Sequence, residues 1–244
     1  MARVRLDQLV VDRGLTPSRE RARALILAGQ ITINGQRAGK AGNLVDEDAE
    51  LALLAPDHPY VGRGGVKLAH ALDTFQIDVA GTEALDIGAS TGGFTDVLLT
   101  RGATRVVALD VGHGQLDWRL REDPRVVVME KMNARHLTLA DLPGPVDIVV
   151  IDVSFISLRL ILTQVPSLLR PGASVVALVK PQFEAGRAEV RKGVVRDAAI
   201  HARVVREVGD AASEVGLTAV ASTPSPIAGA KGNVEFFLHL IPRT

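Results

Sequence analysis

The sequence contains no cysteine, which excludes disulfide bonds, thiolate metal sites and a cysteine nucleophile. It also has no run of about 18 apolar residues, so no segment is expected to span a membrane. No signal peptide is expected either, because Arg3 and Arg5 follow Met1 without an apolar core behind them. Together these absences predict a protein of the reducing cytoplasm.

Aromatic residues are also scarce, at 3% of the chain, with one Trp and one Tyr, too few for a membrane-interface belt. The net charge is zero, so the whole-chain charge indicates no partner. Its distribution is uneven: residues 1–45 carry eight Lys and Arg against three acids, a local net of +5, and the next twelve carry five acids and no base. The basic segment is a candidate nucleic-acid surface, with an ordinary solvated face as the alternative.

The first part of the chain has the pattern of a small α+β unit. Residues 3–13 predict a short helix, and Thr16-Pro17-Ser18 starts a second one. Residues 30–33 alternate as a strand does and lead into Asn34-Gly35, a strong hairpin signal. Residues 50–54 predict a further strand that completes the unit.

From residue 66 onward, strands and helices alternate, which predicts an α/β domain with a parallel, doubly wound sheet that ends in an antiparallel hairpin. Helices are expected at 158–165, ended by Pro171-Gly172, and at 198–215. The basic segment 185–197 reads as a loop, either a mobile lid or a solvated loop. The strands are expected at 84–87, 105–111, 126–129, 146–153, 173–179, 217–222 and 234–240. The domains are expected at 1–57 and 66–244, with a linker at 58–65.

A glycine-rich turn follows the first of these strands and precedes a helix. Glycines let a ligand approach the backbone, and the helix N-terminus behind them offers N–H groups. The spacing Asp86-x-Gly88-x-x-x-Gly92 differs from the dinucleotide fingerprint, which disfavours a nicotinamide dehydrogenase. It resembles the first motif of S-adenosylmethionine (SAM) methyltransferases. A turn that binds nothing is the alternative interpretation.

The resemblance to SAM methyltransferases implies a set of cofactor-binding residues at strand ends. An acid that ends the strand after the glycine turn is placed to accept hydrogen bonds from both ribose hydroxyls of the cofactor. Asn133 is a candidate for the adenine edge, or an ordinary surface asparagine. The full set is Asp86, Gly88, Ser90 and Gly92 in the turn, with Asp110, Asn133 and Asp152 at later strand ends.

Four ionisable residues lie where ligands of such a sheet collect, namely Lys67, Asp152, Lys180 and Glu235. Singly, each reads as a surface charge or an ordinary ion pair. In this order around the glycine turn they resemble the tetrad of ribose 2′-O-methyltransferases of the heat-shock rRNA methyltransferase type. The motifs are GRGGVKL at 62–68, LDIGASTGGFTD at 85–96, ALDVGHGQL at 108–116, DVSFIS at 152–157, VKPQFE at 179–184 and GNVEFFL at 232–238.

The N-terminal unit resembles the RNA-binding module shared by a small-subunit ribosomal protein, pseudouridine synthases and tyrosyl-tRNA synthetases. That resemblance implies RNA contacts by Arg5, Arg19, Arg23 and Lys40, to which Arg63 of the GRGGVKL motif is added. With this module in front of a Rossmann-like methyltransferase domain, the whole chain is similar to the TlyA (hemolysin A) family. The implied partners are ribosomal RNA or ribosomal subunits.

The family resemblance implies SAM-dependent 2′-O-methylation of an rRNA cytidine. Lys180 is the implied proton acceptor. Lys67 is a second cation that orients the hydroxyl and favours the neutral amine, and Asp152 and Glu235 fix the two amines. SAM brings the reactive carbon, so no metal is required.

Three questions stay open at the level of sequence. A non-catalytic ribosome assembly factor would keep the same RNA-binding module and fold. A membrane-lysing toxin, which the family's second name suggests, is disfavoured by the missing apolar runs and the few aromatics. The substrate is expected in large-subunit rRNA, because the chain ends four residues after Leu240 and the members that modify both subunits resemble longer chains.

Overall fold

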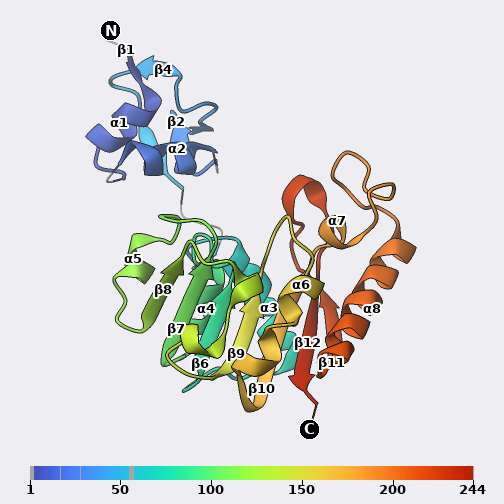
Figure 1. Cartoon of the computed structure of the whole chain (residues 1–244). Coiled ribbons are helices and arrows are strands. Elements are labelled where there is room, and N and C mark those ends of the chain that lie inside the picture. The colour runs from blue at the N-terminus through green and yellow to red at the C-terminus, as the bar shows by residue number, and fades with distance from the viewer. Residues whose placement is uncertain (1–2, 17, 28, 55–57, 244) are drawn as a thin grey trace. The chain divides into compact units, whose positions relative to one another are not determined.

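The computed structural model describes residues 3–16, 18–27, 29–54 and 58–243 (Figure 1). The chain divides into two compact units, residues 1–59 and 60–244. The division falls inside the predicted linker at 58–65. The first helix of the second unit, α3 (Gly64–Phe75), also begins inside that range.

The N-terminal unit combines two short helices with short antiparallel strand pairs. The outer strands of its three-stranded sheet both pair with the central β2. Asn34 and Gly35 join β2 to β3 with φ values of 49° and 77°, which is the left-handed geometry of a tight hairpin turn. The elements are β1 (Arg3–Arg5), α1 (Leu6–Asp12), α2 (Arg19–Leu27), β2 (Ile31–Ile33), β3 (Gln36–Arg37), β4 (Leu44–Asp46) and β5 (Leu51–Leu53).

The first predicted helix starts later than residue 3. Arg3–Arg5 pair antiparallel with Leu44–Asp46, so α1 begins only at Leu6. Pro17, which was expected to start the second helix, lies outside the described residues. Leu6, Leu9 and Val10 of α1 form a small buried core with Ala22, Leu25 and Ile26 of α2, as their helical spacing predicts.

The C-terminal unit contains a seven-stranded sheet in the order β11-β12-β10-β9-β6-β7-β8. The five strands from β6 to β10 are parallel, and β12 pairs antiparallel with β10 and β11. The predicted parallel sheet with a terminal hairpin is therefore confirmed. The strands are β6 (Glu83–Ile87), β7 (Arg105–Asp110), β8 (Val126–Glu130), β9 (Val146–Ile151), β10 (Leu169–Val179), β11 (Leu217–Pro224) and β12 (Phe236–Pro242).

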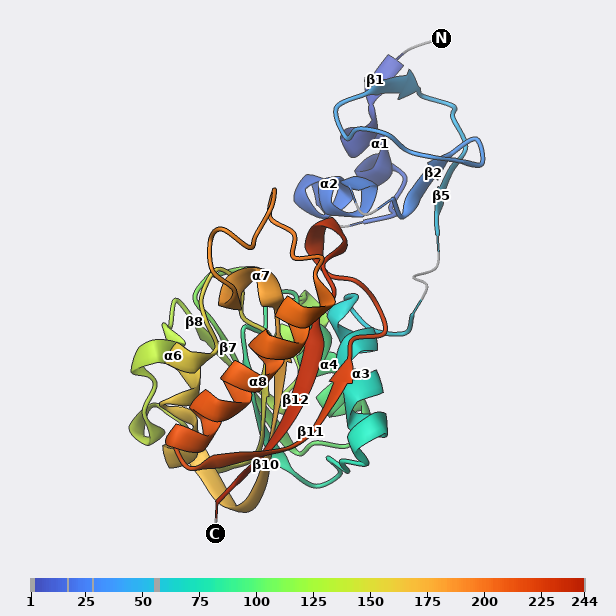
Figure 2. The same ribbon diagram turned by 90° about the vertical axis from the view of Figure 1, so that its right-hand side faces the viewer.

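Helices cover both faces of this sheet (Figure 2). One core packs α6 and α8 against it, and the other packs α3 and α4 against it. The strands between them are nearly continuous apolar runs because both of their faces are buried. Besides α3, the helices are α4 (Gly93–Thr100), α5 (Trp118–Arg121), α6 (Arg159–Leu162), α7 (Pro181–Glu184) and α8 (Ala198–Glu214), with short 3₁₀ turns η1 (Ala134–His136), η2 (Leu139–Asp141), η3 (Val165–Leu168) and η4 (Ala230–Gly232).

Two local predictions were wrong. The helix expected over 158–165 ends at Leu162, and Pro171-Gly172 do not terminate it but lie within β10. The register of β10 against β9 shifts between Leu169 and Ser174, an irregularity that accommodates the proline and the positive φ of Gly172. In addition, β12 begins at Phe236, so Glu235 precedes the last strand instead of lying within it.

None of the helices within the described ranges has the length and apolar character needed to cross a membrane.

Candidate active site

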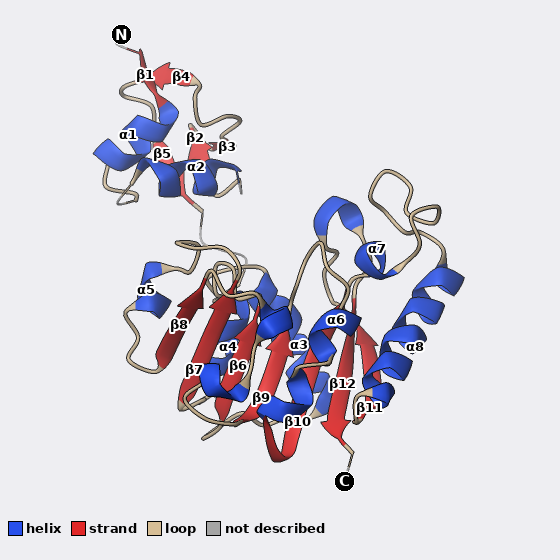
Figure 3. Cartoon of the chain, viewed as in Figure 1, coloured by secondary structure: helices blue, strands red, loops and turns tan. Residues whose placement is uncertain are grey.

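The carboxyl ends of β6, β7, β9 and β10 lie at one edge of the sheet, because these strands are parallel (Figure 3). Ligands of open parallel sheets bind at this edge. The glycine turn follows β6, Asp110 ends β7, Asp152 follows β9 and Lys180 follows β10. The topology thus brings most of the predicted site residues to a single edge.

The glycine turn needs its glycines for steric reasons. Gly88 has a φ of 89°, and a Cβ there would lie 2.5 Å from the backbone oxygen of Asp152. Gly92 has a φ of 96°, and a Cβ there would overlap the side chain of Leu120. Both positions combine left-handed backbone with close packing, so neither has room for a side chain, and Gly88 lies directly against the end of β9.

Asp110 holds two backbone segments at once. Its Oδ2 accepts a hydrogen bond from the Ser90 N–H at 2.8 Å, and its Oδ1 accepts one from the Gly112 N–H at 2.7 Å. The carboxylate therefore joins the glycine turn to the loop after β7. Its oxygens keep further lone pairs for a hydroxyl-bearing ligand.

Of the other two predicted cofactor-binding side chains, Asp86 is buried and Asn133 is exposed. Asp86 is fully buried, and its Oδ2 accepts a hydrogen bond from the Thr95 hydroxyl at 2.6 Å. Burial raises the pKa of Asp86 to about 7, the bond from Thr95 opposes that rise, and the nearby charges of Asp152 and Asp110 add to it. Asn133 is exposed, and its Oδ1 accepts a hydrogen bond from the Arg135 N–H as the N-cap of η1.

We expect Asp86 to make stability depend on pH. Its folded-state pKa of about 7 lies above its ordinary value of 3.8, so its ionisation disfavours the folded state. Its contribution is present at about pH 4 and is lost as the pH rises through about 7, at about 1.4 kcal/mol per pH unit in between. Urea unfolding of the wild type and of Asp86→Asn from about pH 4 to about pH 8 checks this. The difference between the two should move in favour of the variant as the pH rises, and a constant difference would contradict the assignment.

The Lys180 side chain is held by two neighbours from the loop after β9. Its Nζ lies 2.5 Å from Asp152 Oδ1 and donates a hydrogen bond to the Ser154 hydroxyl at 2.8 Å. Lys180 is buried, whereas Asp152 is partly exposed. The Asp152 backbone also lies at the start of the glycine turn: its N–H donates to the carbonyl of Ile87, the last residue of β6, at 2.9 Å, and its carbonyl packs against Gly88. Lys180 is thus connected to the glycine turn through a single residue.

Lys67 and Glu235 form the second pair. Lys67 Nζ donates to Glu235 Oε2 at 2.5 Å, and both side chains are nearly buried. Val179 pairs with Phe236 across β10 and β12, so Lys180 and Glu235 are the next positions along these two strands. A Cβ on Gly229 would overlap the Glu235 carboxylate, which shows how closely the loop before η4 covers it. The four predicted residues therefore form two ion pairs, Lys180 with Asp152 and Lys67 with Glu235. The pairs are neighbours because Lys180 and Glu235 lie next to paired positions of β10 and β12.

The predicted arginines of the N-terminal unit converge on one acid. Asp7 is fully buried, and it accepts hydrogen bonds from Arg5, Arg19 and Arg23 at 3.0–3.1 Å. The bonds from Arg5 above all, and then those from Arg23 and Arg19, hold the pKa of Asp7 well below its ordinary value, against the opposing effect of burial. The three arginine side chains remain about half exposed, so they form one positive surface around a shared anion.

The two other predicted RNA-binding residues, Lys40 and Arg63, lie outside the helices and strands. Lys40 is exposed in the loop between β3 and β4. Arg63 precedes α3 in the C-terminal unit, and its Nη2 lies 3.4 Å from the Ala228 carbonyl oxygen.

Comparison with known families assigns both units. A family model described as FtsJ-like methyltransferase matches residues 60–241. The chain belongs to the FtsJ-like methyltransferase family. An S4 domain model matches residues 4–51, so an S4 domain precedes the FtsJ-like domain.

Several relatives align with nearly the whole chain. The 16S/23S rRNA (cytidine-2′-O)-methyltransferase TlyA of Mycobacterium tuberculosis is 48% identical over 99% of this chain and 91% of its own length. Hemolysin A of Brachyspira hyodysenteriae is 40% identical over 98% of this chain and 100% of its own length. A solved structure of a hemolysin-named protein from Streptococcus thermophilus has a TM-score of 0.79 and 45% identity, and it covers 100% of this chain and 90% of that one. The resemblance to the TlyA (hemolysin A) family is confirmed.

Several residues of the FtsJ-like and S4 domains were not singled out from sequence. Asp7 and Ser154 were not expected to organise the arginine cluster and Lys180, and Thr95 was not expected to bind Asp86. For Asp7 the sequence does offer a signal, because an acid that lies among basic residues is a natural partner for them. Within the described parts of the chain, His, Asp and Glu form no group that could hold a metal ion.

Proposed function

We propose that the protein methylates the 2′-hydroxyl of a cytidine ribose in ribosomal RNA, with SAM as the methyl donor. The observation that carries the proposal is the position of the Lys180 amine. Asp152 and Ser154 hold this amine, and the backbone of Asp152 in turn bonds to the residue that precedes the glycine turn. The name of the Mycobacterium tuberculosis relative, 48% identical, supports the substrate class. That name covers both ribosomal subunits, so the rRNA of both belongs in the test.

The residues around the glycine turn fit SAM. Gly88 and Gly92 let the turn pack closely against Asp152 and Leu120, and the partly exposed Asp110 carboxylate lies beside Ser90, where it can accept both ribose hydroxyls. Asp86 is buried and bonds to Thr95 at the start of α4. We therefore propose that it supports the glycine turn and does not contact the cofactor directly. The amide nitrogen of Asn133 is assigned to the adenine edge. When bound, SAM supplies an electrophilic methyl group.

Lys180 provides the base in this proposal. Its Nζ takes the proton of the ribose hydroxyl, for which the amine must be neutral at that moment. Asp152 and Ser154 fix the position of Nζ, which matters because proton transfer requires hydrogen-bond distance. Lys67, itself fixed by Glu235, is the second cation and orients the hydroxyl.

RNA recognition is assigned to the arginine cluster of the S4 domain, to Lys40 and to Arg63. Guanidinium groups suit phosphate because they donate two parallel hydrogen bonds. The half-exposed arginines around Asp7 are fixed in position before RNA arrives, which lowers the entropy lost on binding.

Mapping of 2′-O-methyl groups tests the proposal. The purified protein is incubated with SAM and either ribosomal subunits or bare rRNA, and methylated nucleotides are located in both 16S and 23S rRNA by mass spectrometry. We expect methylated cytidine in one or both RNAs. Binding of rRNA without any methylation would instead support the non-catalytic assembly factor.

Asp110→Ala is expected to weaken SAM binding. The variant removes the acceptor for the ribose hydroxyls and releases the Ser90 and Gly112 N–H groups, so we expect Kd for SAM to rise about 10–100-fold. Isothermal titration calorimetry with SAM measures this. Asp123→Ala, which removes an exposed ion pair with Arg125 after α5, is the control and should leave Kd unchanged. A Kd for Asp110→Ala equal to that of the wild type would remove Asp110 from the cofactor site.

A further inference from the structure

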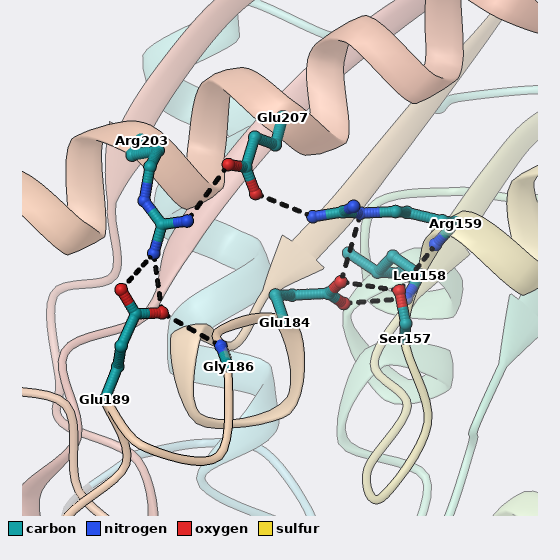
Figure 4. Close-up of polar contacts among 8 residues, drawn as sticks. All are labelled: Ser157, Leu158, Arg159, Glu184, Gly186, Glu189, Arg203 and Glu207. Atoms are coloured by element: carbon teal, nitrogen blue, oxygen red, sulfur yellow. Dashed lines mark hydrogen bonds and ion pairs between the residues drawn. The ribbon is translucent and has the colours of Figure 1, made fainter.

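Two segments at the proposed active site are joined at both of their ends. Residues 152–158 follow β9, and residues 180–184 follow β10. At the near end, Asp152 and Ser154 hold Lys180. At the far end, Glu184 accepts hydrogen bonds from the Ser157 hydroxyl at 2.6 Å and from the Leu158 N–H at 2.7 Å (Figure 4). The segment that carries the partners of Lys180 is thus fixed to the helix that Lys180 caps.

The Glu184 carboxylate is unusual because it is buried. Its side chain is only 2% exposed, and burial raises its pKa, opposed by the bonds from Ser157 and Leu158 and by the charge of Arg159. A buried carboxyl group is costly unless its hydrogen bonds are satisfied, and here both oxygens accept one. Breaking these bonds would leave a buried charge and a free loop.

A chain of ion pairs continues from Glu184 to α8. Arg159 lies 3.9 Å from Glu184 and bonds to Glu207 at 2.9 Å, and Arg203 bonds to Glu207 and Glu189 (Figure 4). These four outer side chains are all about one-third exposed or more, so each of their pairs contributes little. At the far end of the 152–158 segment, the buried bonds of Glu184 therefore constrain the chain more than the outer ion pairs do.

We propose that Glu184 is a positioning residue for methyl transfer. It fixes residues 154–158 relative to α7 and so sets where Asp152 and Ser154 hold the Lys180 amine. This inference rests on the proposed function, because it assigns Glu184 a role through Lys180. A displacement of a catalytic group by about 1 Å costs on the order of 100-fold in rate.

Kinetics of three variants test the inference. Glu184→Ala removes both bonds, and we expect kcat to fall about 10–100-fold with an unchanged Kd for SAM. Glu184→Gln should recover most of kcat, because its amide oxygen can accept from Leu158 N–H while its amide nitrogen donates to the Ser157 hydroxyl. Ser157→Ala removes one of the two bonds to Glu184, together with the longer bond that the Ser157 hydroxyl accepts from the Arg159 N–H, so a several-fold loss is expected there even if Glu184→Ala does not fold. Arg203→Gln, which breaks only outer pairs, is the matched control and should stay within about twofold of wild type.

A pH profile separates positioning from loss of folded protein. If Glu184 acts through Lys180, the midpoint of the kcat profile moves in Glu184→Ala, whereas partial unfolding lowers kcat without moving the midpoint. Wild-type kcat in both Glu184→Ala and Ser157→Ala, an unmoved midpoint, or no recovery in Glu184→Gln would overturn the inference while leaving the proposed function intact. No methylation by the wild type would overturn both. In that case hydrogen exchange of the Leu158 amide would still show whether Glu184 holds the segment.

Discussion

Lys180→Met is expected to abolish methyl transfer while leaving SAM binding intact. The variant keeps the length of the side chain but removes the only group that we assign to take the hydroxyl proton, and loss of a general base costs about 100- to 10,000-fold. Single-turnover transfer of labelled methyl groups to rRNA measures the rate, and calorimetry measures Kd for SAM. An active Lys180→Met enzyme would remove Lys180 from the chemistry.

Lys180→Arg distinguishes the base from the cation. Arginine keeps the positive charge beside Asp152 but does not lose its proton at any working pH. If Lys180 acts as the base, Lys180→Arg is as inactive as Lys180→Met. A substantial rate in Lys180→Arg would show that the charge alone orients the ribose hydroxyl, and the proton would then leave by another route.

The sequence was sufficient to place the candidate site residues at strand ends, but not to pair them. Asp152 and Lys180 follow long apolar strands, and parallel strands bring their carboxyl ends together, so their meeting could be predicted. Which lysine binds which acid depends on register. The antiparallel pairing of Val179 with Phe236 places Glu235 beside Lys180, yet the Glu235 side chain binds Lys67. Such a choice among contacts tens of residues apart leaves no local pattern.

The errors in the fold have a similar cause. Pro171-Gly172 is a good helix terminator in sequence, but here a register shift lets the pair lie within a strand. Residues 3–5 fit a helical pattern, and their pairing with residues 44–46 overrides it. In both cases a long-range backbone pairing decides the structure. Local propensity therefore predicted the middle of the long strands and the Asn34-Gly35 hairpin, but not the start of β10 or the pairing of residues 3–5.

Replacing Arg5, Arg19 and Arg23 together by glutamine is expected to weaken rRNA binding strongly. Each arginine that contacts a phosphate releases counterions on binding, so the slope of log K against log salt should fall by about one for each arginine lost. With three contacts removed we expect affinity at low salt to fall on the order of 100- to 1,000-fold. Filter binding of rRNA fragments across a salt series measures both quantities, with the triple lysine variant as the control that keeps the charge.

The Asp7 carboxylate makes this prediction decisive. It binds all three arginines but carries one negative charge against their three, so the cluster keeps a net charge of +2 for RNA. If the arginines served only to hold α1 and α2 together through Asp7, the glutamine variant would lower the unfolding temperature of the S4 domain and leave the salt slope unchanged. If they bind phosphate, the slope falls in the glutamine variant and not in the lysine variant. Because stability and salt slope are separate measurements, the two roles of one cluster can be separated in the same protein.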